Sequence, residues 1–438
     1  MKLLVVGTGA REHALVWKLR RDAPDAEVFA TAGNAGLDSE AEPLPVSPTD
    51  VNALLDAARR RGVDLTVIGP EAPLAAGVAD ALSEARIAVF GPSAAAARIE
   101  TSKAWCHEIA AAAGVPMARA GAFAEIDPAI AFARALDAEG RGIVVKADGL
   151  AGGKGVTVAT DLDEAIAATR AVLAQPAAQV VIEERLSGRE ASCIAMCDGR
   201  DALALPIARD HKRLGDGDSG PNTGGMGAYS PLPDLPDEAA DEIVQRFHRP
   251  ILAELARRGS PFVGALYAGI MLTADGLRLL ECNARLGDPE TQVILPRLAA
   301  PLGPVLLAAA RGRLLDTTRP WALDGARLPV VPGATVGVVL AAAGYPDRPR
   351  WGDPIGGLDA AAAGGALVFH AGTRHRPGNG YETAGGRVLT VVGAGVDVVT
   401  AHARAEAAAD AIDFAGVQRR RDIGADPSSA VRLVAAGT

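Results

Sequence analysis

The stretch that decides the fold of the central part of this chain is VVKADGLAGGKGV, residues 144–156. One apolar run ends at Lys146, and a glycine-rich turn that carries Lys154 leads into the next apolar run. The pattern predicts two strands joined by a turn whose backbone N–H groups can approach an anion closely. It is not a Walker A loop, because Gly155 stands where that loop needs Ser or Thr. We interpret the stretch as a flap over phosphates; the alternative is a surface hairpin with an exposed lysine.

A second glycine-rich stretch, DHKRLGDGDSGPNTGGMGAYSP, occupies residues 210–231. Almost none of its residues is apolar, which indicates a segment outside the core. Lys212 and Arg213 add positive charge, and Asp210 can orient an amine or a hydrated metal. We interpret the segment as a loop that closes over a small phosphorylated substrate; the alternative is a disordered loop. Its predicted substrate contacts are Asn222, Thr223 and Gly224.

Residues 1–100 alternate short apolar runs with amphipathic helical patterns, which predicts a doubly wound parallel sheet. We expect this region to be a substrate-binding α/β domain. The predicted strands are Lys2–Val6, Glu27–Ala30, Leu65–Ile68 and Ile87–Phe90, and the predicted helices are Glu12–Arg21, Thr49–Arg61 and Leu74–Ala85.

The first turn of this domain, GTGARE at residues 7–12, is an incomplete dinucleotide-binding motif. Glu12 occupies the place of the third glycine, and no acidic residue closes the second strand, so NAD binding is disfavoured. The turn still suits a phosphate or another anion at a helix N-terminus, and Gly9, Arg11 and Glu12 are its candidate substrate contacts. Glu71, after the third strand, is a candidate for ribose hydroxyls or simply a carboxylate at a helix start.

We expect residues 101–310 to form a central domain, with a small antiparallel lid over about residues 118–190. The predicted lid strands are Ile143–Lys146, Val156–Ala159, Val180–Glu183 and Ala191–Met196, and two longer strands, Phe262–Thr273 and Leu277–Cys282, follow. After Pro301 the composition shifts. Residues 311–438 are expected to be a C-terminal α+β module, with strands Thr335–Ala341, Ala366–His370 and Arg387–Val392 and a helix Val398–Ile412.

The sequence ECNAR at residues 281–285 closes an apolar strand with three polar side chains on one face. The Glu281 carboxylate and the Asn283 amide oxygen are hard ligands of the kind Mg²⁺ prefers, and Arg285 can neutralise a phosphoryl charge. The alternative is a polar sheet edge. Asp288, a few residues further on, is a candidate for binding an ammonium group.

Composition excludes several function classes. The chain has 438 residues and a net charge of −9, which argues against general binding to nucleic acids or membrane surfaces. Its four cysteines form no CxxC pair, so a structural zinc site is not expected. Neither a signal peptide nor a membrane-spanning run is evident, and we expect a cytoplasmic protein. The cluster Arg419–Arg421 suits a small anionic ligand or a solvated helix end.

Taken together, these motifs resemble the ATP-grasp superfamily and, within it, the phosphoribosylamine–glycine ligase family. The resemblance spans nearly the whole chain in the right order. It rests on GTGAREHALVWKL, GPEAPLAAG, VVKADGLAGGKGV, the 210–231 stretch, ECNARLGDPETQVILPRL and the terminal RRDIG. It implies that ATP, glycine and 5-phosphoribosylamine give glycinamide ribonucleotide, ADP and phosphate through a glycyl phosphate, in de novo purine synthesis.

The resemblance also implies residue roles. Lys103, Lys146 and Lys154 would hold ATP phosphates, and Glu183, Leu186 and Glu190 would bind adenine and ribose. Glu281 and Asn283 would bind Mg²⁺ or Mn²⁺. The predicted catalytic residues are Arg285, Lys146 and Asp210, and Arg420 and Arg421 join Gly9 and Arg11 as candidates for the ribose phosphate.

The preceding strand supplies no further metal carboxylate, which leaves a second metal open. Small-molecule substrates, no nucleic acid or membrane partner and a monomeric state are expected. The alternatives are an ATP-grasp carboxylase or formate-using transferase and, in a different class, a non-catalytic nucleotide-binding protein.

Overall fold

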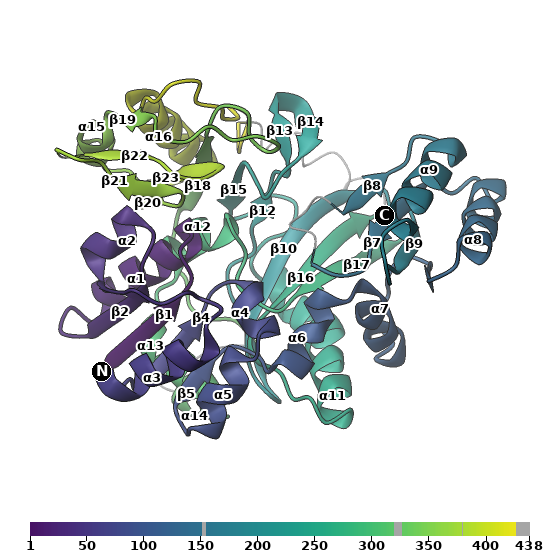
Figure 1. Cartoon of the computed structure of the whole chain (residues 1–438), viewed down its shortest axis with the longest axis horizontal. Coiled ribbons are helices and arrows are strands. Elements are labelled where there is room, and N and C mark those ends of the chain that lie inside the picture. Colours follow the sequence, from purple (N-terminus) through teal and green to yellow (C-terminus); the bar gives the residue numbers. More distant parts are fainter. Residues whose placement is uncertain (151–154, 319–325, 379, 426–438) are drawn as a thin grey trace.

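The computed structural model describes residues 1–150, 155–318, 326–378 and 380–425. In Figure 1 the N-terminal part and the C-terminal part lie side by side on the left, and the central part extends to the right. The predicted fold class is confirmed. The chain has a parallel sheet at the N-terminus, antiparallel sheets in the centre, and a C-terminal part that contains both helices and strands.

The N-terminal sheet has the strand order β3-β2-β1-β4-β5, and all its pairs are parallel. Its strands are β1 Lys2–Val6, β2 Glu27–Thr31, β3 Glu42–Leu44, β4 Leu65–Ile68 and β5 Ala88–Phe90. The helix predicted over 74–85 is divided into two helices, because Gly77 adopts φ 84 between them. The helices of this part are α1 Ala10–Asp22, α2 Ala35–Glu40, α3 Val51–Arg61, α4 Glu71–Ala75 and α5 Val78–Glu84.

The lid is an antiparallel sheet of order β6-β9-β7-β8 that lies at the right of Figure 1. Helices α8 and α9 pack on it and share a hydrophobic cluster with its strands. Two short helices, α6 Ala94–Thr101 and α7 Lys103–Ala112, lead into it from the N-terminal domain. The lid elements are β6 Ala120–Phe123, α8 Ile126–Ala138, β7 Ile143–Ala147, β8 Val156–Val158, α9 Leu162–Leu173 and β9 Val180–Glu184.

The prediction that Ala191–Met196 belongs to the lid was wrong. These residues lie in β10 Arg189–Asp198, which pairs along its length with β16 Val263–Thr273 in the central sheet β11-β10-β16-β17. Residues 191–198 are all buried, as expected of a strand between two others and covered on both faces. The central sheet is completed by β11 Ala202–Ala204 and by β17 Gly276–Asn283, the second arm of the predicted hairpin.

The 210–231 stretch is only partly outside the core. Its end forms β15 Gly227–Ser230, which pairs with the C-terminal strand β18 Ala334–Ala341 and is buried throughout. The C-terminal sheet therefore has the order β12-β15-β18-β23-β20, with two strands contributed from the middle of the chain. The exposed part is the hairpin of β13 Arg213–Gly215 and β14 Ser219–Asn222. The strand β15 was not predicted, because glycine is common both in loops and in strands that approach another backbone closely.

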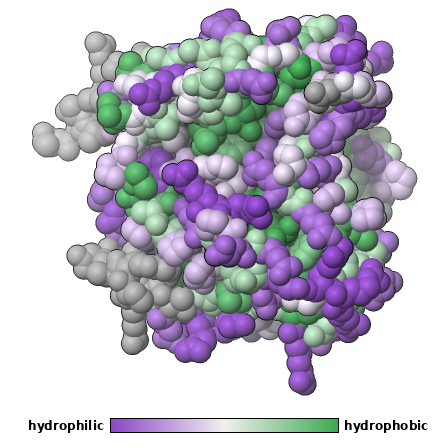
Figure 2. Space-filling model, turned by 90° about the vertical axis from the view of Figure 1, so that its left-hand side faces the viewer, coloured by the Kyte–Doolittle hydropathy of each residue, from purple (hydrophilic) through white to green (hydrophobic). Residues whose placement is uncertain are grey.

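The remaining elements complete the central and C-terminal parts. No helix of the described ranges is long and apolar enough to span a membrane. Figure 2 shows the side of the molecule that lies at the left of Figure 1, where hydrophilic and hydrophobic residues are interspersed. These elements are β12 Arg209–Asp210, α10 Ala239–Ile243, α11 Arg249–Arg257, α12 Glu290–Ile294, α13 Leu302–Ala310, α14 Leu314–Thr318, β19 Pro354–Ile355, α15 Leu358–Ala363, β20 Leu367–His370, β21 Thr373–His375, β22 Tyr381–Thr383, β23 Arg387–Gly395 and α16 Val398–Ala411.

Candidate active site

One large cleft, of about 1340 Å³, is lined by residues of the N-terminal domain, the lid, the central sheet and the C-terminal part. Lys146 and Glu281 both line it, although they lie in different sheets. Lys154 lies outside the described residues. The sequence-predicted residues that line the cleft are Gly9, Arg11, Glu12, Glu71, Lys103, Lys146, Glu183, Leu186, Glu190, Asp210, Asn222, Thr223, Gly224, Glu281, Asn283, Arg285 and Asp288.

Lys103 lies where helix α7 meets the end of strand β7. Its ammonium group donates to the carbonyl oxygens of Ala147 and Gly149, both at 2.9 Å. The Asp148 carboxylate accepts from the Ser102 hydroxyl at 3.0 Å and from the Lys103 amide at 2.5 Å, so it caps the helix. Burial lowers the pKa of Lys103. This junction fixes the start of the glycine flap against the helix.

Lys146 projects from β7 toward its neighbouring strand. Its ammonium group lies 2.8 Å from one carboxylate oxygen of Glu183, and the other oxygen lies 2.8 Å from Nε2 of His107. Burial opposes ionisation of Glu183, but the charges and hydrogen bonds of Lys146 and His107 together outweigh it, and the pKa of Glu183 lies below its usual value. Both oxygens of the Glu183 carboxylate are therefore engaged, by Lys146 and by His107. Its predicted contact with adenine or ribose stays a prediction.

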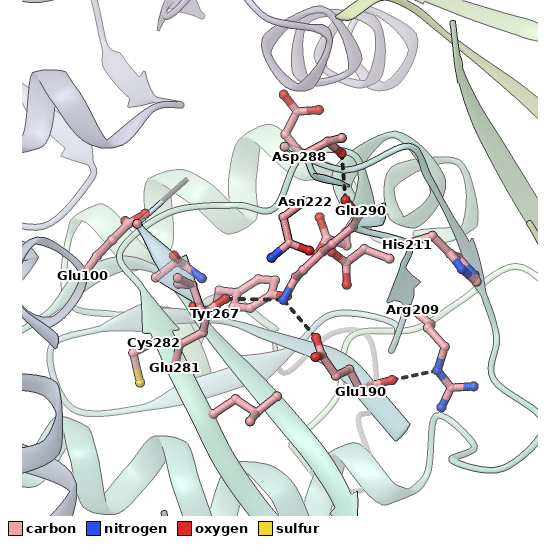
Figure 3. A pocket seen from close by; sticks show the side chains of 18 of the residues that line it. Glu100, Glu190, Arg209, His211, Asn222, Tyr267, Glu281, Cys282, Asp288 and Glu290 are labelled. Atoms are coloured by element: carbon pink, nitrogen blue, oxygen red, sulfur yellow. Dashed lines mark hydrogen bonds and ion pairs between the residues drawn. The ribbon is translucent and has the colours of Figure 1, made fainter. Parts of the chain in front are cut away.

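Glu281 belongs to a chain of charges across the centre of the cleft (Figure 3). The ammonium group of Lys212 lies 3.6 Å from Glu281 and 2.9 Å from Glu190. Lys212 lowers the pKa of the Glu281 carboxyl, which is consequently an anion at neutral pH. Lys212 thus holds two predicted ligand-binding carboxylates near one another.

Glu281 and Asn283 are suitable ligands for a divalent cation. They stand two residues apart on β17 and line the same cleft, so they offer a carboxylate and an amide oxygen together. The described residues contain no group of three or more His, Cys, Asp or Glu that could hold a metal alone. Such a cation would therefore need oxygen ligands from a bound substrate and from water.

Asp210 lies next to this chain of charges. Removal from water raises its pKa to about 7, with the carboxylates of Glu290 and Glu190 adding to the shift and Lys212 opposing it. Glu290 itself accepts a hydrogen bond of 2.8 Å from Ser192. Asp210 is therefore a carboxyl of the cleft that can change its protonation state near neutral pH.

Arg285 differs from its predicted role as a free cation. Its guanidinium lies 3.2 Å from Glu71 and 3.1 Å from Glu100, which is buried at the end of α6. Glu100 also accepts from the backbone amide of Ala284 at 2.8 Å. Arg285 consequently links the N-terminal domain to the central sheet, and two carboxylates already neutralise its charge.

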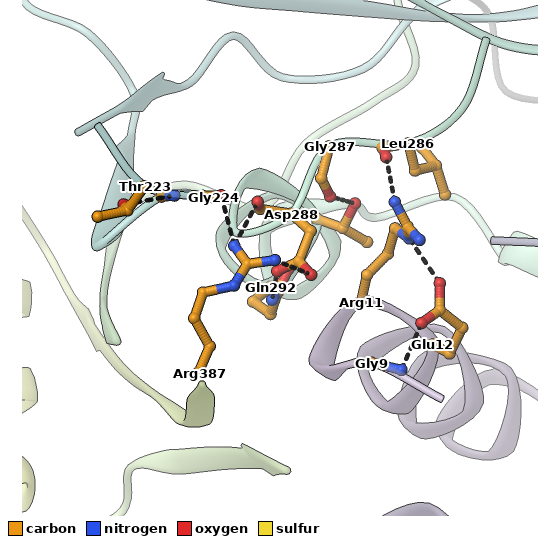
Figure 4. A network of polar contacts seen from close by, with 12 residues as sticks. Gly9, Arg11, Glu12, Thr223, Gly224, Leu286, Gly287, Asp288, Gln292 and Arg387 are labelled. Carbon is orange, nitrogen blue, oxygen red and sulfur yellow. Dashed lines mark hydrogen bonds and ion pairs between the residues drawn. The ribbon is translucent and has the colours of Figure 1, made fainter. Parts of the chain in front are cut away.

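The glycine turn at the N-terminus is occupied by a side chain of its own helix (Figure 4). Glu12 accepts from the amide of Gly9 at 2.6 Å and from Nε of Arg11 at 2.5 Å. Arg11 also donates to the carbonyl oxygen of Leu286 at 3.0 Å. Glu12 thus takes the place that an anion was predicted to occupy at Gly9, while Arg11 still lines the cleft.

Asp288 is engaged by the C-terminal part of the chain (Figure 4). Arg387, at the start of β23, donates to the Asp288 carboxylate and to its carbonyl oxygen, both at 2.8 Å, and also to the carbonyl oxygen of Gly224. Gln292 donates to the other carboxylate oxygen at 2.7 Å. Asp288 therefore connects the central part of the chain to the C-terminal part. Its predicted contact with an ammonium group stays a prediction.

Arg420 and Arg421 are not among the described residues that line the cleft. Arg420 is buried and donates to Asp218 at 2.6 Å and to Asp422 at 2.7 and 2.6 Å. Arg421 is exposed and pairs with Glu406 and Asp410. The predicted phosphate contact of these two arginines conflicts with this arrangement, because their charges are already paired.

Sequence reasoning missed several residues that shape the cleft. His107, Glu100 and Arg387 belong to none of the motifs quoted above, so sequence analysis did not select them. Lys212 was noticed only as positive charge in a glycine-rich loop. The i, i+4 spacing of Lys103 and His107 on one helix is the signal that could have found His107.

Three family models match consecutive parts of the chain. They describe phosphoribosylglycinamide synthetase: its N domain at residues 1–100, its ATP-grasp (A) domain at residues 101–291 and its C domain at residues 335–426. A phosphoribosylamine–glycine ligase from Allochromatium vinosum is 46% identical over 432 residues, covering 97% of this chain and 98% of that protein. The chain belongs to the phosphoribosylamine–glycine ligase family.

Solved structures agree with the family assignment. The phosphoribosylamine–glycine ligase from Thermotoga maritima superposes with a TM-score of 0.79 at 33% identity, covering 97% of this chain and all of that one. The biotin carboxylase domain of the Hydrogenobacter thermophilus 2-oxoglutarate carboxylase gives a TM-score of 0.68 at 17% identity, covering 95% and 91% of the two chains. That second likeness shows the shared fold alone.

The family defines the reaction class. The chain is an ATP-dependent carbon–nitrogen ligase that makes glycinamide ribonucleotide in purine synthesis, and it acts on small-molecule substrates. ATP use and a divalent metal go with the ATP-grasp fold.

Proposed function

We propose that this cleft joins glycine to 5-phosphoribosylamine, with the ATP phosphates held between Lys103, Lys146 and the Glu281–Asn283 pair. The observation that carries the proposal is that these four residues, from three separate segments, line one cleft. Two ammonium groups and a carboxylate facing a shared space suit a phosphate chain with its counter-ion.

The nucleotide base belongs at the junction of the lid and the central sheet. Leu186 lines the cleft just after β9, where backbone groups of an irregular segment are available to adenine, and Glu190 lines it from the start of β10. Glu190 keeps one carboxylate oxygen outside its contact with Lys212, and that oxygen suits a ribose hydroxyl. We assign adenine and ribose to this junction.

A magnesium or manganese ion bound at Glu281 and Asn283 would supply charge neutralisation at the phosphates. The chain's own residues do the rest. Lys103 and Lys146 bind and orient the phosphates, and Lys212 keeps Glu281 and Glu190 in place. The walls of the cleft exclude water from the reacting atoms, which matters because an acyl phosphate hydrolyses readily.

Two substitution steps follow from this arrangement. A carboxylate oxygen of glycine attacks the γ-phosphorus of ATP, and the bond from that phosphorus to ADP breaks, giving glycyl phosphate and ADP. The amine nitrogen of phosphoribosylamine then attacks the glycyl carbon, the carbon–oxygen bond to phosphate breaks, and the amine loses a proton. Asp210, with a pKa of about 7, is the cleft carboxyl suited to receive that proton.

The amine substrate belongs between the N-terminal turn and the 222–224 segment. Arg11, Asn222, Thr223 and Gly224 line that side of the cleft. Arg11 is the cation suited to the ribose phosphate, because it lines the cleft, beside its partner Glu12, whereas Arg420 and Arg421 do not line it. We further propose a monomer that works in the cytoplasm, where purine precursors are made, without nucleic-acid partners.

A release assay for ADP tests the assignment. ADP should form at a substantial rate only when glycine and phosphoribosylamine are both present, and the product should carry one glycyl group by mass. ADP release with bicarbonate or formate in place of glycine would indicate the carboxylase or transferase alternative. Nucleotide binding without turnover of any of these substrates would indicate a non-catalytic protein.

A further inference from the structure

Helix α7 presents two polar side chains to the lid. Lys103 and His107 are four residues apart and therefore lie on the same face of the helix. Lys103 contacts the end of β7 through its ammonium group, and His107 contacts β9 through Nε2. The helix itself is not part of the lid sheet, and it packs against α6, α11 and β17 and also against the lid strand β6.

The contact of His107 is made with a carboxylate that has a second partner. Oε1 of Glu183 lies 2.8 Å from His107, and Oε2 lies 2.8 Å from the ammonium group of Lys146. The Glu183 side chain is only 5% exposed and Lys146 only 11%. An ionised carboxylate accepts hydrogen bonds and donates none, so Nε2 of His107 carries the hydrogen.

A carboxylate fixed at both oxygens has little freedom to rotate. Lys146 and Glu183 stand on adjacent strands of the lid, β7 and β9. His107 is the partner of Glu183 that comes from outside those strands. Without it, Glu183 and Lys146 would remain paired but could turn together about their side-chain bonds.

We propose that His107 is a positioning residue that aims the ammonium group of Lys146 at the ATP phosphates by holding the far oxygen of Glu183. This inference rests on the proposed role of Lys146 at those phosphates. It assigns to His107 no contact with substrate and no proton transfer. The relay also ties the lid to α7 close to the junction formed by Lys103 and Asp148.

The test uses the full-length enzyme and the variants His107→Ala, His107→Gln and Lys146→Ala. The loss of one hydrogen bond to a charged group should raise the KM for ATP about tenfold in H107A. The KM values for glycine and phosphoribosylamine should stay within about twofold. H107Q should recover most of the loss, because its amide can donate to Glu183.

The matched control is Glu108→Gln on the neighbouring position of α7. Glu108 pairs with Arg258, and its side chain is 56% exposed. E108Q should keep all three KM values. If H107A is not recovered as a folded protein, His107→Leu replaces it, because leucine fills the space without donating a hydrogen bond. The ATP KM of H107L is then compared with that of H107Q.

Several outcomes would overturn the inference. An ATP KM in H107A or H107L equal to that of wild type, with K146A clearly impaired, would show that His107 does not position Lys146. Equal increases in all three KM values, not recovered in H107Q, would show a merely structural role. An unchanged ATP KM in K146A would instead refute the proposed role of Lys146, and this separates the two failures.

Discussion

Arg420 donates a hydrogen bond of 2.6 Å to Asp218, a residue 202 positions earlier in the chain. Asp218 lies at the tip of the β13–β14 hairpin, and the amide of Gly217 beside it donates to Asp422 at 2.9 Å. The RRDIG segment therefore fastens the hairpin, which leads directly into the cleft residues Asn222 and Thr223.

Arg420→Ala and Asp218→Ala should each weaken this attachment. We expect both to raise the KM for phosphoribosylamine, because the hairpin carries the 222–224 segment. Their effects should overlap, with a coupling free energy of about 1 kcal/mol in a double-mutant cycle. Unfolding in denaturant measures the coupling, and strictly additive effects would contradict the attachment.

Arg421→Ala is the comparison variant from the same segment. Its side chain is 60% exposed, so we expect a change of no more than about 0.5 kcal/mol in the free energy of unfolding. A raised phosphoribosylamine KM in R421A without loss of stability would support the phosphate contact that the sequence suggested.

Glu281→Gln should reduce glycine-dependent ADP formation by about 100-fold or more, because a neutral amide is a far weaker ligand for a divalent cation. The measurement is the initial rate of ADP release at saturating substrates, with the melting temperature recorded in parallel. Glu242→Gln, an exposed carboxylate on α10, is the control. Turnover of E281Q close to that of wild type would remove Glu281 from the metal site.

We expect His248 to make the stability of the protein sensitive to acid. Burial lowers the pKa of this histidine from 6.5 to about 4, and its Nε2 lies 3.2 Å from the carbonyl oxygens of Cys193 and Leu266. At pH values between these two pKa values, His248 is protonated in the unfolded chain but neutral in the folded protein. The free energy of unfolding should thus fall as the pH drops below 6.5, by up to about 1.4 kcal/mol per pH unit, and be unaffected above it.

The variant His248→Gln removes this titration. Denaturant unfolding at pH 7.5 and pH 5 should show a smaller difference between the two pH values for H248Q than for wild type. H248Q is expected to be less stable at pH 7.5, because it cannot reproduce both carbonyl contacts, so the pH difference is the decisive quantity. Equal differences in the two proteins would contradict a neutral buried His248.

Gly227→Ala should destabilise the C-terminal sheet. Gly227 has φ 154, and a Cβ atom there would lie 2.4 Å from the carbonyl oxygen of Gly337 on β18. Gly365→Ala is the matched control, since Gly365 also has positive φ, at 81, but its Cβ would meet nothing within 4 Å. We expect G365A to cost about 1 kcal/mol and G227A at least twice that. Equal melting temperatures of G227A and G365A would show that β15 can move away from β18.

The sequence predicted the parts of the fold that follow a regular pattern. Four strands of the parallel N-terminal sheet and the β16–β17 hairpin have clear apolar runs, and each is found close to its predicted range. The three-residue strand β3 was not predicted. The assignment of β10 to the lid was wrong, because a strand that is buried on both faces is apolar throughout, and that pattern does not indicate which sheet it joins. β15 was not predicted, because a strand of four residues is too short to show an alternation of apolar and polar side chains.

Site residues could be predicted where they lie close together in the sequence. Glu281 and Asn283 alternate on one strand, so their shared face follows from the sequence. Arg285, Asp288 and Arg420 were expected to be free for ligands, but each meets partners far away in the chain. Such pairings depend on the tertiary fold, and composition alone cannot reveal that a charge is already neutralised.

The pairing of β15 with β18 has a consequence for dissecting the protein. The central domain cannot be cut away cleanly after residue 291, because a fragment ending there would carry β15 with one of its edges unpaired. A strand with free N–H and C=O groups invites association with other chains. The ligase is therefore an interlocked molecule whose domains share a sheet, and it should be expressed and engineered as one piece.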